Sequence, residues 1–202
     1  MLAARRALTR RGAALAALVP AAALVLASCS SDDSTSSAEP QDGGTLVYAT
    51  GDAEPTCLDP HVGGNYPQAM LTTQVLEPLV GRDADGEILP WLATGWEISD
   101  DGLTWDFTLA DGITFTDGTP FDAEAVKVNV EHLQDPATQS STGYLALAKV
   151  SEVEVVDATH ARFHLTEPDS ALGESLSQPW LAIESPAGID RGMDANCAAP
   201  VG

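Results

Sequence analysis

The sequence predicts an α/β fold built on a mostly antiparallel sheet, and three observations lead to this prediction. Between Trp96 and Phe115, apolar and polar residues alternate with a period of two, as in strands that bury one face. Asp-Gly pairs interrupt these runs, and such pairs are typical of hairpin turns because glycine allows a positive φ. The next segment, 119–133, carries an apolar stripe at helical spacing.

The elements before this region are predicted from short apolar runs and turn residues. TLVYAT (45–50) is typical of a buried strand, and 51–65 is a turn-rich loop. We expect a helix over 66–79, because Pro67 suits a first turn and Pro78 suits an end. One largely apolar face of this helix is predicted to contain Met70, Leu71, Gln74, Val75 and Leu79.

The elements from residue 96 onward are predicted from the same two periodicities, of strands and of helices. Strands are expected over 96–99, 103–109 and 113–116, and a hairpin over 151–167 that turns at 157–160. The helix over 119–133 should begin at Asp122 as N-cap. Its buried stripe is predicted to contain Ala123, Val126, Val130 and Leu133.

Three further segments complete the expected order of elements. A short helix is expected within 168–178, and a buried strand over 181–185. The last segment, 185–202, is predicted to be loop and turn. Because no capped helix or closing strand comes last, we expect a truncated chain.

The aspartates of the Asp-Gly pairs are predicted to turn the chain rather than bind an ion. A calcium loop of the EF-hand type needs oxygen ligands at positions 1, 3, 5 and 12 and glycine at position 6. Placing Gly86, Gly102 or Gly112 at position 6 leaves an apolar residue, a glycine or a threonine where ligands are required. Hairpin turns therefore remain the better interpretation.

The first 28 residues are predicted to be an export signal. They carry four arginines and no acidic residue, followed by an uncharged stretch rich in alanine, leucine and valine. LASC (26–29) resembles the lipobox of bacterial lipoproteins, which implies acylation of Cys29 and anchoring to the outer face of the cell membrane. The alternative is an ordinary signal peptide with an incidental cysteine. Residues 29–44 are rich in Ser, Asp and Gly and are predicted to form a flexible tether.

Charge and cysteine content narrow the class of protein. All 30 acidic residues follow Cys29, whereas four of the nine basic residues precede it, so the remaining five give a net charge of −25 beyond Cys29. Such a surface repels nucleic acid, and we expect no nucleic-acid partner. Cys57 and Cys197 remain as an even number in an exported chain and are predicted to form a disulfide. Two buried free thiols are the alternative.

No catalytic, metal or cofactor motif is present in the sequence. It contains no G-x-S-x-G elbow, P-loop, H-E-x-x-H or C-x-x-C, so we expect no enzyme, no metal and no cofactor. His160 and His164 are four residues apart but straddle a predicted hairpin turn and strand rather than one helix face. Both are expected at the surface.

Several segments in order resemble family 5 of the extracytoplasmic solute-binding proteins of ABC importers. They are GGTLVYAT, PTCLDPH, the long run from LEPLVGRDADG to VEHL, and SPAGIDRGMDANCAAPVG. The chain departs from the family pattern at Ala110, where Lys or Arg is common, and around Thr116. It is also much shorter than family members.

The resemblance implies a lobe like that of type II periplasmic binding proteins, with a mostly antiparallel accessory subdomain, truncated before the second lobe. The implied parts of the main lobe are 45–69 and 186–202, with the accessory α+β subdomain over 70–185. It also implies a small solute, most simply an oligopeptide, captured by hinge closure and delivered to ABC permease subunits.

Ligand contacts are expected from the loop before the first helix and from one later tryptophan. The candidate residues are Asp59, His61, Asn65, Tyr66 and Trp180. The alternatives are that Asp59 and His61 only cap the loop and that Trp180 belongs to the core. A lipid-anchored hydrolase and a structural surface lipoprotein remain as competing functions.

Overall fold

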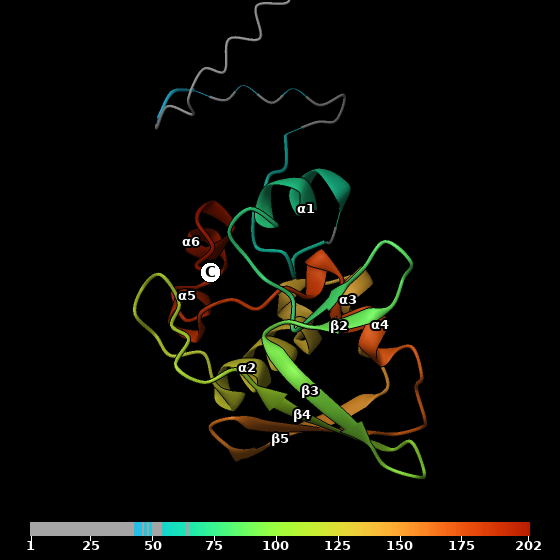
Figure 1. Cartoon of the computed structure of the whole chain (residues 1–202). Coiled ribbons are helices and arrows are strands. Elements are labelled where there is room, and N and C mark those ends of the chain that lie inside the picture. Colours follow the sequence, from blue (N-terminus) through green and yellow to red (C-terminus); the bar gives the residue numbers. More distant parts are fainter. Residues whose placement is uncertain (1–42, 46, 48, 50–53, 64) are drawn as a thin grey trace, which may run out of the picture. The chain divides into compact units, whose positions relative to one another are not determined.

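A computed structural model describes residues 43–45, 47, 49, 54–63 and 65–202 (Figure 1). The chain divides into two units, Met1–Tyr48 and Ala49–Gly202. The predicted export signal, Cys29 and nearly all of the predicted tether lie outside the described residues. Among the residues that are described, no helix is both long enough and apolar enough to cross a membrane.

The second unit contains all the helices and strands of the described part of the chain. The strands are β1 (Val80–Arg82), β2 (Ile88–Pro90), β3 (Ala93–Ile98), β4 (Thr104–Leu109), β5 (Val150–Asp157) and β6 (His160–Leu165). The α-helices are α1 (Tyr66–Thr72), α2 (Ala123–Gln134), α3 (Thr142–Ala146), α4 (Leu172–Leu176), α5 (Pro186–Ile189) and α6 (Met193–Ala198). Two 3₁₀ turns, η1 (Pro136–Thr138) and η2 (Pro179–Leu181), complete the set.

The main sheet has four antiparallel strands in the order β3-β4-β6-β5. Two hairpins build it, since β3 pairs with β4 and β5 pairs with β6, and β4 joins them by pairing with β6. Trp105, Phe107 and Leu109 point from β4 into the core, as the period-two pattern predicts. The rings of Phe107 and Phe163 pack edge to face across the sheet, with centroids 5.2 Å apart.

Asp-Gly pairs turn the chain, as predicted. Gly102 and Gly118 have φ of 68° and 86°, a region that costs other residues energy because of their Cβ. Asp101 Oδ1 accepts a hydrogen bond from the backbone N–H of Leu103 at 3.0 Å, and Asp117 Oδ1 accepts one from Thr119 at 2.8 Å. These carboxylates are therefore structural groups of the turns.

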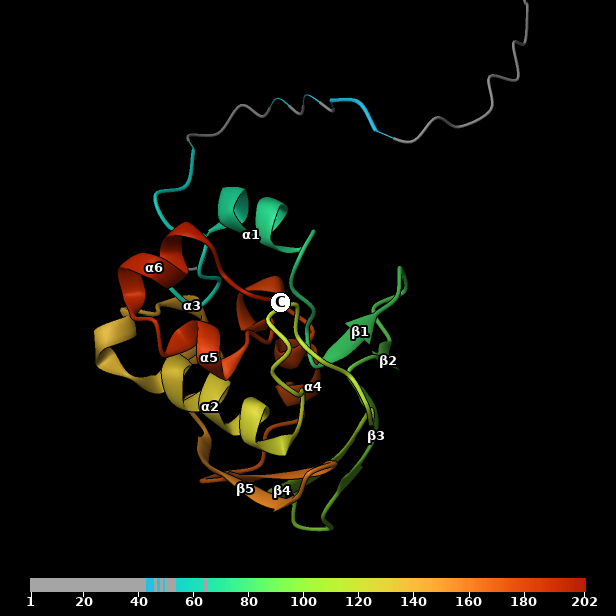
Figure 2. The same cartoon turned by 90° about the vertical axis from the view of Figure 1, so that its left-hand side faces the viewer.

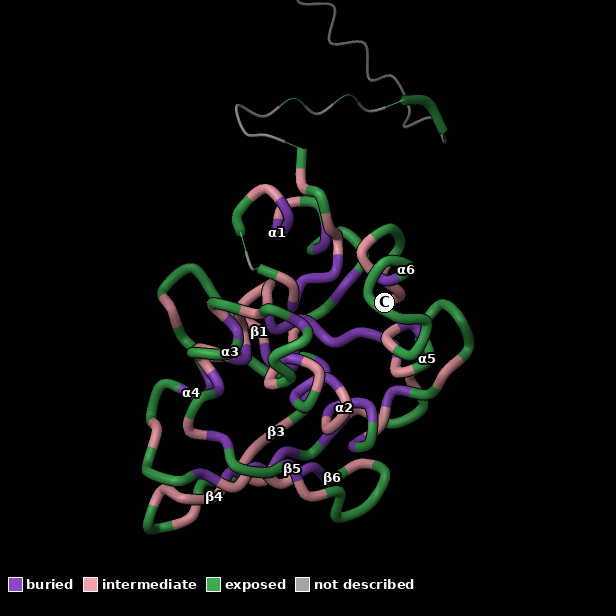
Figure 3. The backbone as a smooth tube through the Cα atoms, turned by 180° about the vertical axis from the view of Figure 1, so that it is seen from behind, coloured by how far each residue is buried: buried purple, intermediate pink, exposed green. Residues whose placement is uncertain are grey.

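Helix α2 covers one face of the main sheet (Figure 2). Asp122 caps it as predicted, because its side chain accepts a hydrogen bond from the Ala125 N–H at 2.9 Å. The predicted stripe is buried, and Figure 3 shows buried backbone along both α2 and the strands beneath it. The core also contains Leu79, Val80, Leu147, Val153, Leu165, Leu172 and Leu181.

Several predicted elements are wrong. The helix predicted over 66–79 ends at Thr72, because the Thr73 side chain bonds back to the Ala69 carbonyl and the chain turns. Its predicted apolar face is largely exposed, and the residues that α1 buries are Gln68, Ala69 and Thr72. In the strand predicted over 45–50, the described residues 45, 47 and 49 are exposed and lie in no strand, since no described strand pairs with them.

Two other predicted strands are reduced to single bridges. Residues 113–116 contribute only the bridge Thr114↔Pro120, and 181–185, although buried, contributes only Glu77↔Ile183. The segment 185–202, predicted as loop, instead contains α5 and α6. Helix α5 packs against α2, and α6 lies farther from the main sheet, on the side of α1 (Figures 1 and 2). The predicted boundaries at 69/70 and 185/186 stay predictions.

Candidate functional site

Five buried or half-buried polar residues meet where the loop before α1, helix α2, the segment 181–185 and helix α6 come together, and we call them the buried cluster. Asp59 and His61 come from the loop before α1, and His132 from the last turn of α2. Glu184 lies in the buried segment 181–185, and Asn196 in α6. All except His132 are at most 1% exposed, and the His132 side chain is 16% exposed.

Asp59 is the centre of the cluster. Its Oδ2 lies 3.0 Å from His132 Nε2 and accepts a hydrogen bond from Asn196 Nδ2 at 3.0 Å. Its Oδ1 accepts the backbone N–H of His61 at 2.8 Å. The Asp59 carboxylate therefore connects three segments by hydrogen bonds, namely its own loop, α2 and α6.

Glu184 is the second carboxylate of the cluster. Its Oε2 accepts a hydrogen bond from Asn196 Nδ2 at 2.6 Å. The side chain of Asn129 in α2 makes two hydrogen bonds to the Glu184 backbone. Asn129 Nδ2 donates to the Glu184 carbonyl at 2.7 Å, and Asn129 Oδ1 accepts the Glu184 N–H at 2.8 Å. Asn196 therefore links the two carboxylates, while Asn129 fixes the position of Glu184.

Burial changes the pKa values of these groups. It raises the pKa of Glu184 to about 9, and the negative charge of Asp59 adds to this rise. It lowers the pKa of His61 to about 4. For Asp59, burial favours a higher pKa, but hydrogen bonds from His132 and Asn196 and the neighbouring imidazoles outweigh it, so the pKa lies below its usual value.

Three buried polar atoms of the cluster have no hydrogen-bond partner within the described part of the chain. They are His61 Nδ1, Glu184 Oε1 and Asn196 Oδ1. One donor atom from each of Asp59, His61, His132 and Glu184 lies within 4.8 Å of the others. Two imidazoles and two carboxylates can together hold a divalent cation. The sequence predicted no metal site, because the four residues come from three distant segments.

The disulfide joins Cys57 to Cys197 at the edge of this cluster, with Cα atoms 4.2 Å apart. The backbone N–H of Leu58 donates to the Cys197 carbonyl at 2.7 Å. Cys57 lies two residues before Asp59, and Cys197 directly follows Asn196. The bridge therefore fastens together two of the segments that build the buried cluster.

The five predicted ligand contacts divide into three groups. Asp59 and His61 come together but are buried, so no solute reaches them in this structure. Asn65 caps α1, since its side chain accepts the Gln68 N–H at 3.0 Å, and Tyr66 beside it is 68% exposed. Trp180 lies in η2, which contacts α1, and its side chain is half-buried against the hydrophobic core.

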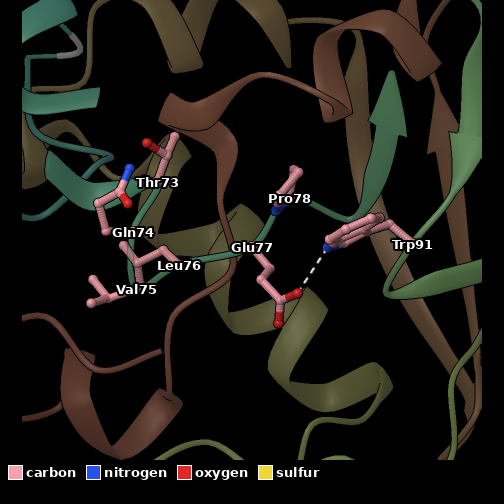
Figure 4. Close-up of a pocket in the computed structure, with 7 residues that line it drawn as sticks. All are labelled: Thr73, Gln74, Val75, Leu76, Glu77, Pro78 and Trp91. Atoms are coloured by element: carbon pink, nitrogen blue, oxygen red, sulfur yellow. Dashed lines mark hydrogen bonds between the residues drawn. The ribbon is translucent and has the colours of Figure 1, made fainter. Parts of the chain in front are cut away.

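An open pocket of about 410 Å³ lies between α1 and β1 (Figure 4). Trp91 Nε1 donates a hydrogen bond to Glu77 Oε1 at 2.9 Å, which holds an exposed indole beside a carboxylate. Sequence reasoning missed this pair, because the two residues are 14 positions apart and belong to no motif. The pocket is lined by Thr73, Gln74, Val75, Leu76, Glu77, Pro78 and Trp91.

Comparison with known protein families identifies the family of this chain. Residues 87–198 match the model of the bacterial extracellular solute-binding proteins, family 5 middle region. The chain belongs to this family. Among its family 5 relatives, the chain is 32% identical over 136 residues to the glutathione-binding protein GsiB of Escherichia coli strain K12. That match covers 67% of the chain and 26% of GsiB, so the chain spans about a quarter of this relative.

Solved structures of other binding proteins share this fold. One is Haemophilus influenzae OppA in complex with RPPGFSPFR, at 26% identity and a TM-score of 0.65 over 72% of this chain and 31% of OppA. Another is NikA from Brucella suis in complex with Fe(III)-EDTA, at 32% identity and a TM-score of 0.59 over 65% of this chain and 26% of NikA. The predicted fold class, an α/β part of a type II periplasmic-binding-protein lobe with antiparallel sheets, is confirmed.

Proposed function

We propose that this chain is part of the substrate-binding component of an ABC importer. In this proposal it helps to capture a small solute, most simply an oligopeptide, outside the cell for delivery to the permease. The family match over 87–198 supports the proposal most strongly. OppA, whose complex contains the peptide RPPGFSPFR, supports the choice of peptide.

The proposed solute contacts are Asn65 and Tyr66, at the exposed start of α1. Asp59 and His61 contribute from the interior, because they hold the loop that leads into this helix. An exposed tyrosine offers a flat apolar face and a hydroxyl, which suits a peptide side chain. The indole and carboxylate of the Trp91–Glu77 pair offer a second contact for a cationic or amphipathic group.

Hinge closure requires solute contacts from two lobes that differ between the open and closed states. The chain spans 26% of GsiB and 31% of OppA, so we expect most of the opposing contacts to come from outside it. Alone, it should bind peptides at least about tenfold more weakly than a polypeptide that includes both lobes. Equal peptide affinities of the isolated chain and the two-lobed polypeptide, both measured by calorimetry, would contradict this.

Replacing Tyr66 should weaken solute binding without unfolding the protein. In a two-lobed protein that carries this sequence, a peptide that binds the native state raises Tm. We expect Tyr66→Ala to lower peptide affinity about tenfold, because this residue is 68% exposed and is the proposed aromatic contact for the solute. The control is Tyr144→Ala, which removes an exposed tyrosine from α3. Equal affinity of the two variants contradicts the assignment of Tyr66, and no Tm rise with peptides, glutathione or metal chelates contradicts the proposed function.

Lipidation of Cys29 is the proposed means of holding the protein outside the membrane. Two acyl chains give stable anchoring, whereas a single chain does not. In cells fed a radiolabelled fatty acid, the wild-type chain should be labelled and fractionate with membranes. Cys29→Ala should lose both properties, while Cys57→Ala should keep the label. An unlabelled wild-type chain rules out the anchor.

A further inference from the structure

We propose that the buried cluster is a structural metal site that binds Zn²⁺ or a similar first-row divalent cation. The donors are the imidazoles of His61 and His132 and the carboxylates of Asp59 and Glu184. Their role in this proposal is to fasten segments of the chain together rather than to contact the solute.

His61 has the arrangement expected of a zinc ligand. Its Nε2 lies 2.9 Å from the carbonyl oxygen of Ala182, which can accept a hydrogen bond only if this nitrogen carries the proton. The lone pair of the neutral ring is then on Nδ1, and Nδ1 has no partner in the described chain. A backbone carbonyl that fixes the tautomer and leaves the other nitrogen free is a common outer partner of a metal-bound histidine.

The remaining donors are close enough for one ion. The rings of His61 and His132 have centroids 5.4 Å apart, and His132 Nε2 is 3.0 Å from Asp59 Oδ2. Zn–N and Zn–O bonds of about 2.0–2.1 Å separate tetrahedral donors by about 3.3 Å. Because no pair of donor atoms is more than 4.8 Å apart, closure needs movements of at most about 1.5 Å, which side-chain rotation can supply.

The unpartnered atoms provide an independent reason to expect a ligand. Glu184 Oε1 and His61 Nδ1 belong to residues that are 0% and 1% exposed. A buried polar atom without a partner is costly, and an ion that accepts both lone pairs removes that cost. Asn196 Nδ2 already orients both carboxylates, at 3.0 and 2.6 Å, as an outer partner of the donors would.

The donor set favours zinc over the other abundant divalent cations. Ca²⁺ and Mg²⁺ prefer oxygen ligands alone, whereas imidazole suits Zn²⁺ and its neighbours. Four protein donors fill a tetrahedral shell, which is the arrangement of a structural site rather than a catalytic one. His132, the one partly exposed donor, gives the ion a way in.

Metal analysis and thermal unfolding test the proposal on the chain purified without a polyhistidine tag. We expect about one Zn²⁺ per chain after dialysis, and a Tm higher by about 5–10 °C at a hundredfold excess of Zn²⁺ over Kd. Mg²⁺ and Ca²⁺ should leave Tm unchanged. Co²⁺ should give the visible absorption of a four-coordinate site, which reports binding without any measurement of stability.

His132→Gln tests the donor set, because glutamine can keep a hydrogen bond to Asp59. It should lower Zn²⁺ affinity more than about tenfold while circular dichroism shows a folded chain. The control is His160→Gln, which removes a surface histidine paired with Asp157 at 2.8 Å and should leave Zn²⁺ affinity unchanged. An ordered water in place of the ion predicts no bound Zn²⁺ and no Tm shift. That result, or equal affinity of the two variants, overturns the proposal.

Discussion

Reduction of the disulfide between Cys57 and Cys197 is expected to lower the free energy of unfolding by about 4–5 kcal/mol. The bridge joins residues 140 positions apart, so it removes a large part of the conformational freedom of the unfolded chain. It also holds together the segments that carry Asp59 and Asn196, which share a hydrogen bond at 3.0 Å. Urea unfolding with and without reductant measures the difference.

The matched control is the double variant Cys57→Ser, Cys197→Ser. It should be as unstable as the reduced wild-type chain, and adding reductant should not change it further. Carrying Cys29→Ser in every sample removes the third thiol from the comparison. A difference of less than about 1 kcal/mol between oxidised and reduced wild type contradicts the prediction.

The hairpins and α2 could be predicted because their residues interact with near neighbours in the sequence. Trp105, Phe107 and Leu109 alternate with polar residues, and Asp-Gly pairs mark the turns beside them. Asp122 and the stripe after it define α2 in the same local way. The β5–β6 hairpin follows the same rule, and its turn uses Asp157 to accept the Thr159 N–H at 2.8 Å.

The shape of α1 could not be predicted, because tertiary contacts override its helical pattern. Val75 keeps the spacing of a buried face but is 58% exposed, since the helix ends at Thr72. Gln68, a polar residue, is buried instead and donates to the Val62 carbonyl at 3.1 Å. The loop before α1 thus decides which side of the helix faces inward.

The buried cluster was missed for a different reason. Its members stand 2 to 137 positions apart, and no spacing rule connects the loop, α2 and α6. One signal was present in the sequence: Glu184 interrupts the apolar run LAIES, which was predicted to be buried. A carboxylate in such a run needs a partner, and that partner is Asn196.

In metal-free protein, the free energy of unfolding is expected to fall by about 3 kcal/mol between pH 6.5 and pH 9. Burial raises the pKa of Glu184 from 4.5 to about 9, so the folded chain keeps a proton that the unfolded chain has lost in this range. Stability that comes from a raised pKa is present at low pH and is lost as pH rises towards the folded value.

Below pH 6.5, His61 changes the free energy of unfolding in the opposite direction. The pKa of His61 is lowered from 6.5 to about 4, so the unfolded chain binds the extra proton there and stability rises with pH. The pKa of Asp59 is also lowered, and its contribution is complete well above 3.8. Above pH 6.5 the contributions of His61 and Asp59 to stability are almost complete. The fall in stability between pH 6.5 and pH 9 therefore comes mainly from Glu184.

Glu184→Gln should remove this fall in stability, because a neutral side chain of the same shape has no proton to lose. Urea unfolding at pH 6.5 and pH 9 with a chelator present measures it. The control is Glu174→Gln, which changes an exposed acidic residue paired with Arg82. In this variant the free energy of unfolding should fall between pH 6.5 and pH 9 as much as in the wild type. The same Glu184→Gln change removes a proposed zinc donor, so it should stabilise the metal-free chain at pH 9 yet abolish the Tm rise with Zn²⁺. A variant that lost stability in both experiments would show that Glu184 serves packing alone.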